Sequence, residues 1–291
     1  MTGFPVRVGI SIAPNDGGPL QAAEVESRGF DLLVVADHLF HYREPEKPFV
    51  DAWMRLAAIT QATSHIRLGT LVTNLSWRQP VLVAKSAIAL DQLSGGRLEL
   101  GVGCGAYPDQ AMMGMADMPA GERVRRLAEG LEVLHRLLSG DTDPFTGQFT
   151  CYQHAEVAPG CVQQPRPPLV VAASGPRALA VAARWADTWN CVTGEGDLDS
   201  SLSILANRIR LLDASCERLG RDPQTLRRSL LLWHLGGADP WAHKGALLEI
   251  VERFSSVGFT DFIAFWPPVQ RSDVLDHVTS ELLPALRPMH P

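Results

Sequence analysis

The sequence alternates between short apolar segments and longer amphipathic segments, and this alternation repeats eight times. The apolar segments have the length of strands, and the segments after them carry apolar residues spaced three and four apart, as in helices. Strands that are apolar almost throughout are typical of parallel sheets with both faces covered. The predicted strands are residues 6–13, 31–36, 66–73, 97–103, 168–174, 187–192, 227–235 and 261–266. The predicted helices are residues 18–29, 51–63, 80–96, 121–140, 176–186, 198–219, 241–257 and 272–287.

Eight strand–helix units predict a closed (β/α)8 TIM barrel, and a doubly wound open sheet is the second choice. The chain has 291 residues, 46% of them hydrophobic, which is enough for one large core. Because barrels of this size are routinely single domains, we expect residues 1–291 to form one TIM-barrel domain. Residues 140–168 are rich in Pro, Gly and polar residues and have no helical period, which predicts an irregular insertion before the fifth strand.

Composition narrows the partners and the compartment. The net charge is −6, with acidic and basic residues mixed along the chain, so we expect no nucleic-acid partner. Five cysteines without a CxxC pair indicate free thiols in a reducing compartment. The first residues lack a basic segment followed by a long apolar one, so we expect no signal peptide, and no apolar run approaches the roughly 20 residues that cross a bilayer. These features predict a cytoplasmic protein with no membrane partner.

Asp37 and His38 directly follow the second predicted strand. Barrel enzymes carry their working groups at the carboxyl ends of strands, so this pair is expected at the mouth of the barrel. Asp37 could bind a ligand or simply cap the segment that follows. His38 could transfer a proton if a reacting group lies near, or be a partly buried structural histidine. His41 lies three residues on, but no third ligand follows at metal spacing, so we expect no metal site.

The segment 101–106 fits the pattern G-x-G-x-x-A after a strand. The dinucleotide fingerprint also needs a helix that begins at once and an acid about 20 residues further on. That distance instead reaches Arg125 and Arg126, and no helix is predicted directly after the glycines. We therefore reject a nicotinamide site of the usual kind, although glycines let a backbone approach a flat ring or a phosphate closely.

Two segments could bind phosphate. Ser174 or Gly175 suits a helix N-cap and Pro176 suits the first helical position, so free N–H groups would face a phosphate there. An ordinary capped helix with nothing bound explains the same pattern equally well. Gly236 and Gly237, after the seventh strand, are a rival site. No G-x-S-x-G elbow is present, which argues against a serine hydrolase.

Four passages resemble the bacterial luciferase-like family of flavin and deazaflavin oxidoreductases. They are RGFDLLVVADHLF, LGTLVTNLSWRQPVLVAKSAIALDQLSGGRLELGVGCG, QQPRPPLVVAASGPRALAVAARWADTWN and the closing GFTDFIAFWPP with LLPALR. The resemblance implies a (β/α)8 barrel with an insertion before the fifth strand, usually a homodimer, that binds FMN or the deazaflavin coenzyme F-420. The ADH form of the second strand end is more similar to the deazaflavin branch.

The resemblance also implies roles for residues at the strand ends. Asp37 would hold a polar edge of the ring, and His38 would stand near its reacting carbon. The remaining cofactor-binding residues would be Thr70, Leu71 and Val72 at a non-prolyl cis peptide behind the ring, Cys104 and Gly105 along the ring or its ribityl chain, and Ala173, Ser174 and Gly175 at the phosphate.

The sequence indicates the substrate-binding residues less clearly than the cofactor-binding residues. Ala106 stands where sugar-phosphate-oxidising relatives carry a catalytic glutamate, so glucose-6-phosphate is not the expected substrate. Tyr42 stands where the same relatives carry a tryptophan. The candidate substrate residues are Tyr42, Trp77, Trp233 and His234, with Trp266 and the segment 39–42 as further walls, although most barrel tryptophans only pack.

The hypothesis from the sequence is an oxidoreductase that transfers a hydride between coenzyme F-420 and a small organic substrate. The first alternative is an FMN-dependent luciferase-like monooxygenase. A non-enzymatic flavin-binding protein is a second alternative. A third is an isomerase or lyase that binds a phosphorylated metabolite at Gly236 and Gly237.

Overall fold

The computed structural model describes residues 4–12, 18–41, 44–105, 107–192, 197–233 and 239–287. The chain divides into two compact units. The first unit contains residues 1–13, 24–34 and 173–291, and the second contains residues 14–23 and 35–172.

Within the described residues, nine strands form one sheet and two short strands form another. The order in the large sheet is β3-β2-β1-β11-β10-β9-β8-β5-β4, and its registered pairs are parallel. Its strands are β1 (Arg7–Ser11), β2 (Leu32–Val35), β3 (Arg67–Thr70), β4 (Thr73–Asn74), β5 (Leu100–Gly103), β8 (Leu169–Ala172), β9 (Thr188–Val192), β10 (Arg227–Leu231) and β11 (Asp261–Phe265).

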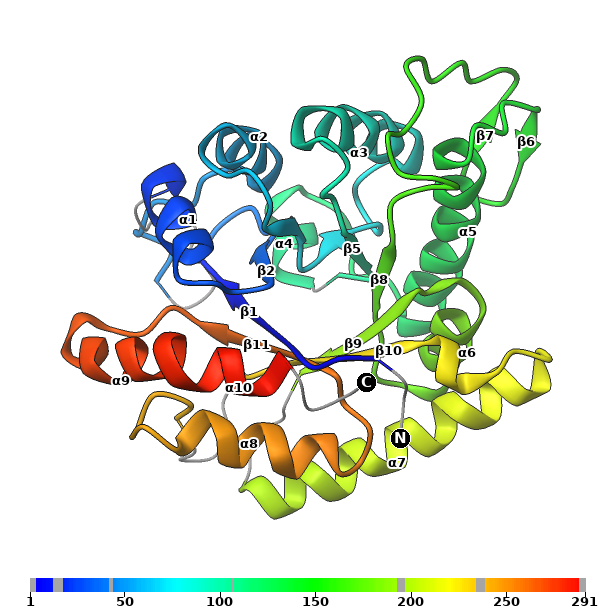
Figure 1. The fold of residues 1–291 in the computed structure, drawn as a ribbon. Coiled ribbons are helices and arrows are strands. Elements are labelled where there is room, and N and C mark those ends of the chain that lie inside the picture. The colour runs from blue at the N-terminus through cyan, green and yellow to red at the C-terminus, as the bar shows by residue number, and fades with distance from the viewer. Residues whose placement is uncertain are drawn as a thin grey trace. The chain divides into compact units, whose positions relative to one another are not determined.

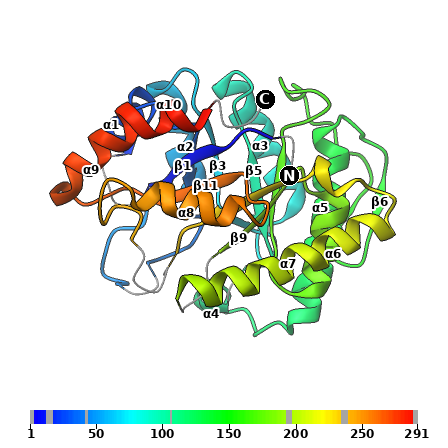
Figure 2. The same ribbon diagram turned by 60° about the horizontal axis from the view of Figure 1, so that its bottom comes forward.

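In the first unit, β1 pairs with β2 and β11, and β10 pairs with β11 and β9. Helix α6 (Pro176–Trp185) packs against α7 (Leu198–Arg218), as Figure 2 shows. Trp189, Phe254 and Phe259 stack or meet edge to face and are almost fully buried. The other helices are α8 (Ala246–Ser255), α9 (Ser272–His277) and α10 (Leu283–Leu286), with one π-helical segment (Val278–Leu282) and short 3-10 turns at Pro223–Thr225 and Val269–Arg271.

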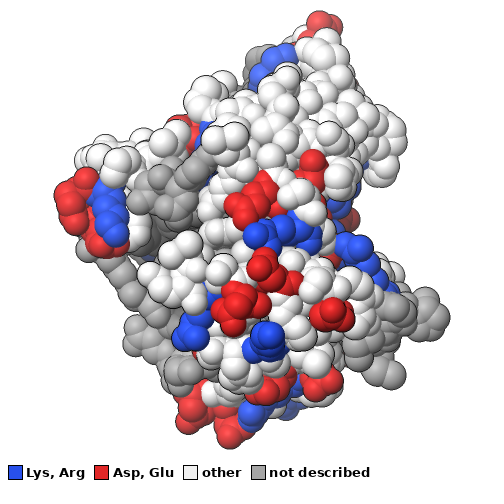
Figure 3. Space-filling model, turned by 60° about the vertical axis from the view of Figure 1, so that its left-hand side comes forward, with Lys and Arg blue, Asp and Glu red and all other residues white. Residues whose placement is uncertain are grey.

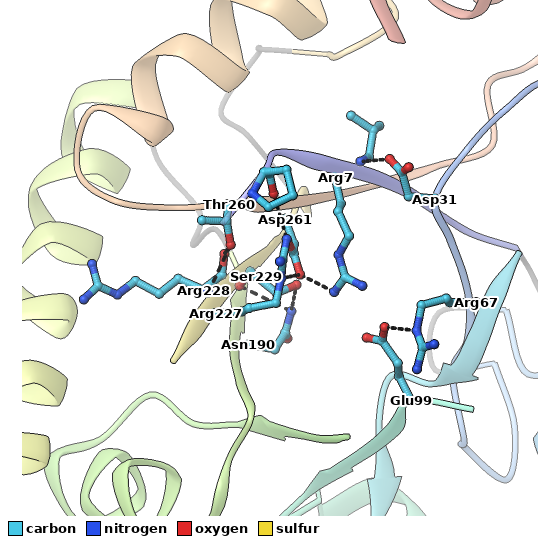
Figure 4. A network of polar contacts seen from close by, with 12 residues as sticks. Arg7, Asp31, Arg67, Glu99, Asn190, Arg227, Arg228, Ser229, Thr260 and Asp261 are labelled. Carbon is cyan, nitrogen blue, oxygen red and sulfur yellow. Dashed lines mark hydrogen bonds and ion pairs between the residues drawn. The ribbon is translucent and has the colours of Figure 1, made fainter. Parts of the chain in front are cut away.

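A buried ion network joins the amino ends of three strands of the first unit. Asp261 begins β11, and its carboxylate accepts from Arg7 of β1 at 2.6 Å and from Arg227 of β10 at 2.6 Å (Figure 4). Nearby, the Asn190 amide donates to the Ser229 hydroxyl at 3.0 Å. Contacts of this kind at the base of a barrel serve stability, because the groups that carry out the chemistry lie at the opposite end.

In the second unit, β5 pairs with β4 and β8, and a bridge between Leu68 and Leu98 joins β3 to the residues before β5. Helix α3 (Pro80–Ser94) packs against α2 (Ala52–Ala62) and α5 (Ala120–Leu138), as seen in Figure 1. As predicted, Pro80 is the first residue of α3, and Gly95 ends it in the left-handed region. Helix α1 (Gly18–Ser27) precedes β2, and the short helix α4 (Tyr107–Met112) follows β5.

The segment 140–168 is mostly irregular and contains an antiparallel hairpin, which was not predicted. The hairpin joins β6 (Phe145–Thr146) to β7 (Cys151–Tyr152). The Glu129 carboxylate on α5 accepts from the backbone N–H groups of Gln148, Phe149 and Thr150 at the turn. This anchor lies outside the segment, which is why composition alone missed the hairpin.

The surface and the cysteines add two observations. On the face drawn in Figure 3, acidic and basic side chains are interspersed. All five cysteines lie among the described residues and none forms a disulfide. Over the described part of the chain, none of the helices has the length and apolar content needed to cross a bilayer.

Candidate active site at the carboxyl ends of the strands

Asp37 lies two residues beyond β2 and is only 1% exposed. Its Oδ1 accepts from the Arg78 guanidinium at 2.6 Å, and Arg78 also donates to Asp51 at 3.1 Å. Asp51, not Asp37, is the helix cap here, since its carboxylate accepts from two N–H groups at the start of α2. The Arg78 guanidinium stacks over the Trp77 ring at 4.4 Å, which fixes its position.

The electrostatics of Asp37 depend on its burial. Burial raises the pKa of the Asp37 carboxyl, and the hydrogen bond and charge of Arg78 oppose that shift. The Thr73 hydroxyl also lies close enough to lower the pKa. No hydrogen bond to Asp37 Oδ2 is found among the described residues. Asp37 therefore presents a buried acceptor atom beside a cation.

His38 is held by a carboxylate from another element. Its Nδ1 lies 3.0 Å from Asp109 Oδ2, and the backbone N–H of Leu39 donates to Asp109 Oδ1 at 2.9 Å. Asp109 is in the first turn of α4 and is fully buried, whereas the His38 side chain is 36% exposed. Phe49 packs on the imidazole with ring centroids 6.2 Å apart. The ring is thus held at Nδ1, and the side chain is partly exposed.

The third predicted strand, 66–73, is interrupted by a cis peptide bond between Leu71 and Val72. The interruption separates β3 from β4, where the prediction had one strand. The Leu71 N–H donates to Val35 O at 2.9 Å, which places this bond beside the end of β2. The Thr73 hydroxyl donates to the Thr70 hydroxyl at 3.1 Å, and Thr70 donates to the backbone of β5. The cis bond falls on the residues that the family resemblance implied.

Cys104 and Gly105 follow β5 and are half-buried. The Ser76 hydroxyl donates to Cys104 O at 2.6 Å, and the Ser76 N–H donates to Asn74 Oδ1 at 2.9 Å. Gly105 has φ of 69°, and a Cβ there would overlap the Asn74 amide. A Cβ on Gly103 would lie 2.7 Å from Val72 Cγ2. The packing of β4 and Val72 against β5 therefore requires glycine at both positions, whether or not a ligand binds.

The proposed phosphate-binding residues belong to the first unit. Gly175 is the N-cap of α6 and Pro176 its first residue, as predicted, with no side-chain capping hydrogen bond. Ala173 is held on both sides, because its N–H donates to Asn190 O and its carbonyl accepts from the Trp189 indole at 2.9 Å. Ser174 and Gly175 are exposed. The start of α6 therefore offers free backbone donors on a fixed support.

The predicted tryptophan walls have different environments. Trp77 is half-buried in the second unit, and no partner for its Nε1 is found among the described residues. Trp233 is 41% exposed after β10 and meets Phe265 edge to face at 5.2 Å. Trp266 meets Phe30 edge to face at 6.4 Å, which fits a packing role.

Several predicted positions lie outside the described residues. They are Tyr42, Ala106, His234, Gly236 and Gly237. Among the residues that are described, no group of three or more His, Cys, Asp or Glu side chains could hold a metal ion.

Two residues of this cluster were missed by the sequence reasoning. Arg78 binds Asp37, and Asp109 binds His38. Arg78 follows a predicted strand end, so a search for a cation near the acid could have found it. Asp109 had no such signal, because no helix was predicted directly after the fourth strand.

The sequence model of the luciferase-like monooxygenase family matches residues 19–240, which is most of the chain. The chain belongs to this family. The family inferred from the sequence is therefore confirmed. Two curated relatives and one solved structure give the resemblance more detail.

The chain is 30% identical over 226 residues to a protein named F-420-dependent hydroxymycolic acid dehydrogenase from Mycobacterium tuberculosis. That match covers 77% of this chain and 60% of the relative, so the chain spans less than two thirds of its length. It is 25% identical to an F-420-dependent glucose-6-phosphate dehydrogenase from Intrasporangium calvum, over 97% of this chain and 99% of the relative.

Solved structures show the fold. A structure titled as an F-420-dependent secondary alcohol dehydrogenase superposes with a TM-score of 0.82 at 21% identity, over 98% of this chain and all of that one. The strand order and this likeness confirm the predicted (β/α)8 barrel.

Proposed function

We propose that the chain is an oxidoreductase that transfers a hydride between coenzyme F-420 and a small organic substrate. Family membership supports an oxidoreductase, and both relatives, which are named as F-420-dependent dehydrogenases, support the deazaflavin coenzyme. The observation that carries the proposal is the end of β2, where a buried Asp37 stands beside a partly exposed, oriented His38.

The residues at the strand ends of the second unit fit a planar ring with polar edges. Asp37 Oδ2, Asn74 Nδ2 and Trp77 Nε1 are buried, with no hydrogen-bond partner among the described residues. Buried polar atoms almost always have a partner, so such atoms indicate a ligand. A ring with both N–H and C=O groups could donate to the Asp37 carboxylate and accept from the side-chain N–H groups of Asn74 and Trp77.

The residues that would hold the coenzyme follow from this fit and from the family resemblance. In the second unit, Asp37 would bind a polar edge of the ring, and the Leu71–Val72 peptide would support a face. Cys104 and Gly105 would line the same ligand. In the first unit, the N–H groups at Ser174 and Gly175 would bind a phosphate, which helix starts favour.

When bound, the coenzyme supplies the acceptor or donor of the hydride. The protein controls the accompanying proton, which histidine can exchange near neutral pH. His38 would take the proton of a substrate hydroxyl as the carbonyl forms, and return it in the reverse direction. The half-exposed Trp77 and Trp233 are proposed substrate contacts, together with Tyr42 and His234.

We also infer the compartment, the oligomeric state, the partners and the domain organisation of the protein. The chain would act in the cytoplasm as a homodimer on a small molecule, with neither nucleic acid nor membrane as a partner. Residues 1–291 would form a single domain, with 140–168 as an insertion. Gel filtration with light scattering tests the dimer, since a monomer at micromolar concentration contradicts it.

The proposal is tested by titrating the purified protein with oxidised coenzyme F-420 and, separately, with FMN, following fluorescence. We expect saturable binding of F-420 and weaker or no binding of FMN. His38→Gln should retain F-420 binding and lose hydride exchange by about 100-fold or more, as expected for loss of general acid–base catalysis. The substrates to try first are secondary alcohols and their ketones.

Binding of FMN alone would contradict the proposal. Oxygen consumption with reduced FMN would then identify the alternative, a luciferase-like monooxygenase, which the family description favours. F-420 binding without hydride exchange for any alcohol or ketone would instead support a carrier protein.

A further inference from the structure

Asp109 makes two hydrogen bonds that together define the orientation of His38. Its Oδ1 accepts from the Leu39 N–H at 2.9 Å, and its Oδ2 lies 3.0 Å from His38 Nδ1. The carboxylate is fully buried. The backbone contact fixes the plane of the carboxylate, because Leu39 directly follows His38 in the chain. Oδ2 is therefore held toward the imidazole rather than merely near it.

This contact determines which nitrogen of His38 carries the proton. An ionised carboxylate can only accept hydrogen bonds, so Nδ1 must be the donor. In the neutral ring, Nε2 then has the free lone pair. Phe49 packs on the imidazole and limits its rotation. In this tautomer Nε2 is the nitrogen that can accept a proton.

We propose that Asp109 is a positioning residue that holds His38 as the Nδ1–H tautomer and stabilises the imidazolium that forms in the reaction. The inference rests on the proposed function and deepens it. In the oxidising direction, the bound oxidised coenzyme would supply the acceptor for the hydride, the electron pair of the substrate C–H bond with its hydrogen. The O–H proton moves to His38 Nε2, and the carbonyl forms.

The matched variant is Asp109→Asn. Its amide oxygen can keep the bond from Leu39, and its NH2 group then faces His38 Nδ1. Nδ1 must then accept, so the ring proton moves to Nε2 and the base is lost. An acid-to-amide change that leaves geometry intact but imposes the wrong tautomer reduces turnover by about 10⁴-fold in a serine protease.

The first measurement is the ¹⁵N spectrum of the histidine rings in the protein without coenzyme. His38→Gln assigns the signal by its absence. We expect a protonated Nδ1 and an unprotonated Nε2 at a pH where the ring is neutral, and the reverse in Asp109→Asn. Asp91→Asn is the control, because Asp91 is a fully buried carboxylate that accepts from Val162 and Gln163 and does not contact His38.

A wild-type ring with its proton on Nε2, or the same tautomer in Asp109→Asn as in the wild type, would overturn the inference. So would a reversed tautomer in Asp91→Asn, since the effect would then be general. If Asp109→Asn does not fold, as judged by circular dichroism, Asp109→Glu replaces it. We expect that variant to keep the Nδ1–H tautomer while its longer side chain displaces the ring.

The second measurement separates this inference from the proposed function. Asp109→Asn should bind F-420 within about threefold of the wild type and lose hydride transfer by about 100-fold or more. Failure of the wild type to bind F-420 would refute the proposed function and leave the tautomer result standing. Unchanged hydride transfer in Asp109→Asn would refute the positioning role alone.

Discussion

At the scale of single residues, Arg78 neutralises a carboxylate that the fold has almost removed from water. Arg78→Met should therefore reduce stability by about 3–5 kcal/mol at neutral pH, because it leaves Asp37 charged and unpaired. Burial already raises the pKa of Asp37, and loss of the guanidinium raises it further. A carboxyl whose folded pKa exceeds its unfolded value loses stability as the pH rises through that interval.

The deficit of Arg78→Met should thus be small near about pH 4 and large near about pH 7, as measured by urea unfolding. The double variant Asp37→Asn with Arg78→Met is the control and should recover much of the loss. A deficit that is the same at both pH values would show that Asp37 is not the group responsible.

The cysteines give a second prediction at this scale. Burial, assisted by the charge of Asp91, raises the pKa of Cys161 to about 12, whereas Cys151 is exposed. The thiolate is the reactive form, so Cys161 should react with a disulfide reagent at about pH 8 only after unfolding. Cys151 should react in the native state, and Cys151→Ser should remove that phase. Rapid native labelling of Cys161, located by peptide mass spectrometry, would contradict the prediction.

The same scale shows how much of the site the sequence could predict. Asp37 and His38 were found because they are adjacent and follow an apolar segment. Their partners Arg78 and Asp109 stand 41 and 71 positions further along the chain, and only the fold brings them together. Local pattern selects side chains at strand ends, but it contains no information about which distant side chains meet.

At the scale of elements, apolar runs predicted every strand of the large sheet, because parallel strands are buried on both faces. Two details did not follow from pattern. The run 66–73 is one apolar segment, yet a cis bond at Leu71–Val72 divides it into β3 and β4. Helix α4 has only six residues and was not predicted, since so short a segment shows no helical period.

The packing of β4 against β5 gives a prediction for an element. A Cβ on Gly103 would lie 2.7 Å from Val72 Cγ2, so Gly103→Ala should cost about 1–3 kcal/mol through overpacking. Gly160→Ala is the control, because nothing lies within 4 Å of its added Cβ. Thermal unfolding measures both variants. Adding Val72→Ala should restore part of the loss, and equal effects of the two glycine variants would contradict the argument.

At the scale of the whole molecule, buried carboxylates serve the candidate site at the carboxyl ends of the strands and stability at the amino ends. Carboxylates at the carboxyl ends, at Asp37 and Asp109, orient groups that remain partly accessible. At the amino end of β11, Asp261 is 2% exposed on its side chain and joins Arg7 and Arg227. The buried Asp261 carboxylate is not placed to exchange a proton with a substrate, so we expect mutations in this network to change the stability of the fold.

The last prediction concerns the pH dependence of global stability. Burial alone would raise the pKa of Asp261, but the charges and hydrogen bonds of Arg7 and Arg227 outweigh it and lower the pKa. A carboxyl with a lowered folded pKa stabilises the fold above its unfolded value of about 3.9, and this stabilisation is lost as the pH falls through the folded pKa. Asp261→Asn should therefore cost about 3–5 kcal/mol at neutral pH, and the difference from the wild type should shrink below about pH 4.

Chemical unfolding of the wild type and Asp261→Asn at both pH values tests this argument. Glu24→Gln is the control, because Glu24 pairs with Arg28 at an exposed position and should change stability by no more than about 1 kcal/mol. If the cost of Asp261→Asn persists unchanged in acid, the loss comes from packing rather than charge. The two arginines would then be held by the fold independently of the carboxylate between them.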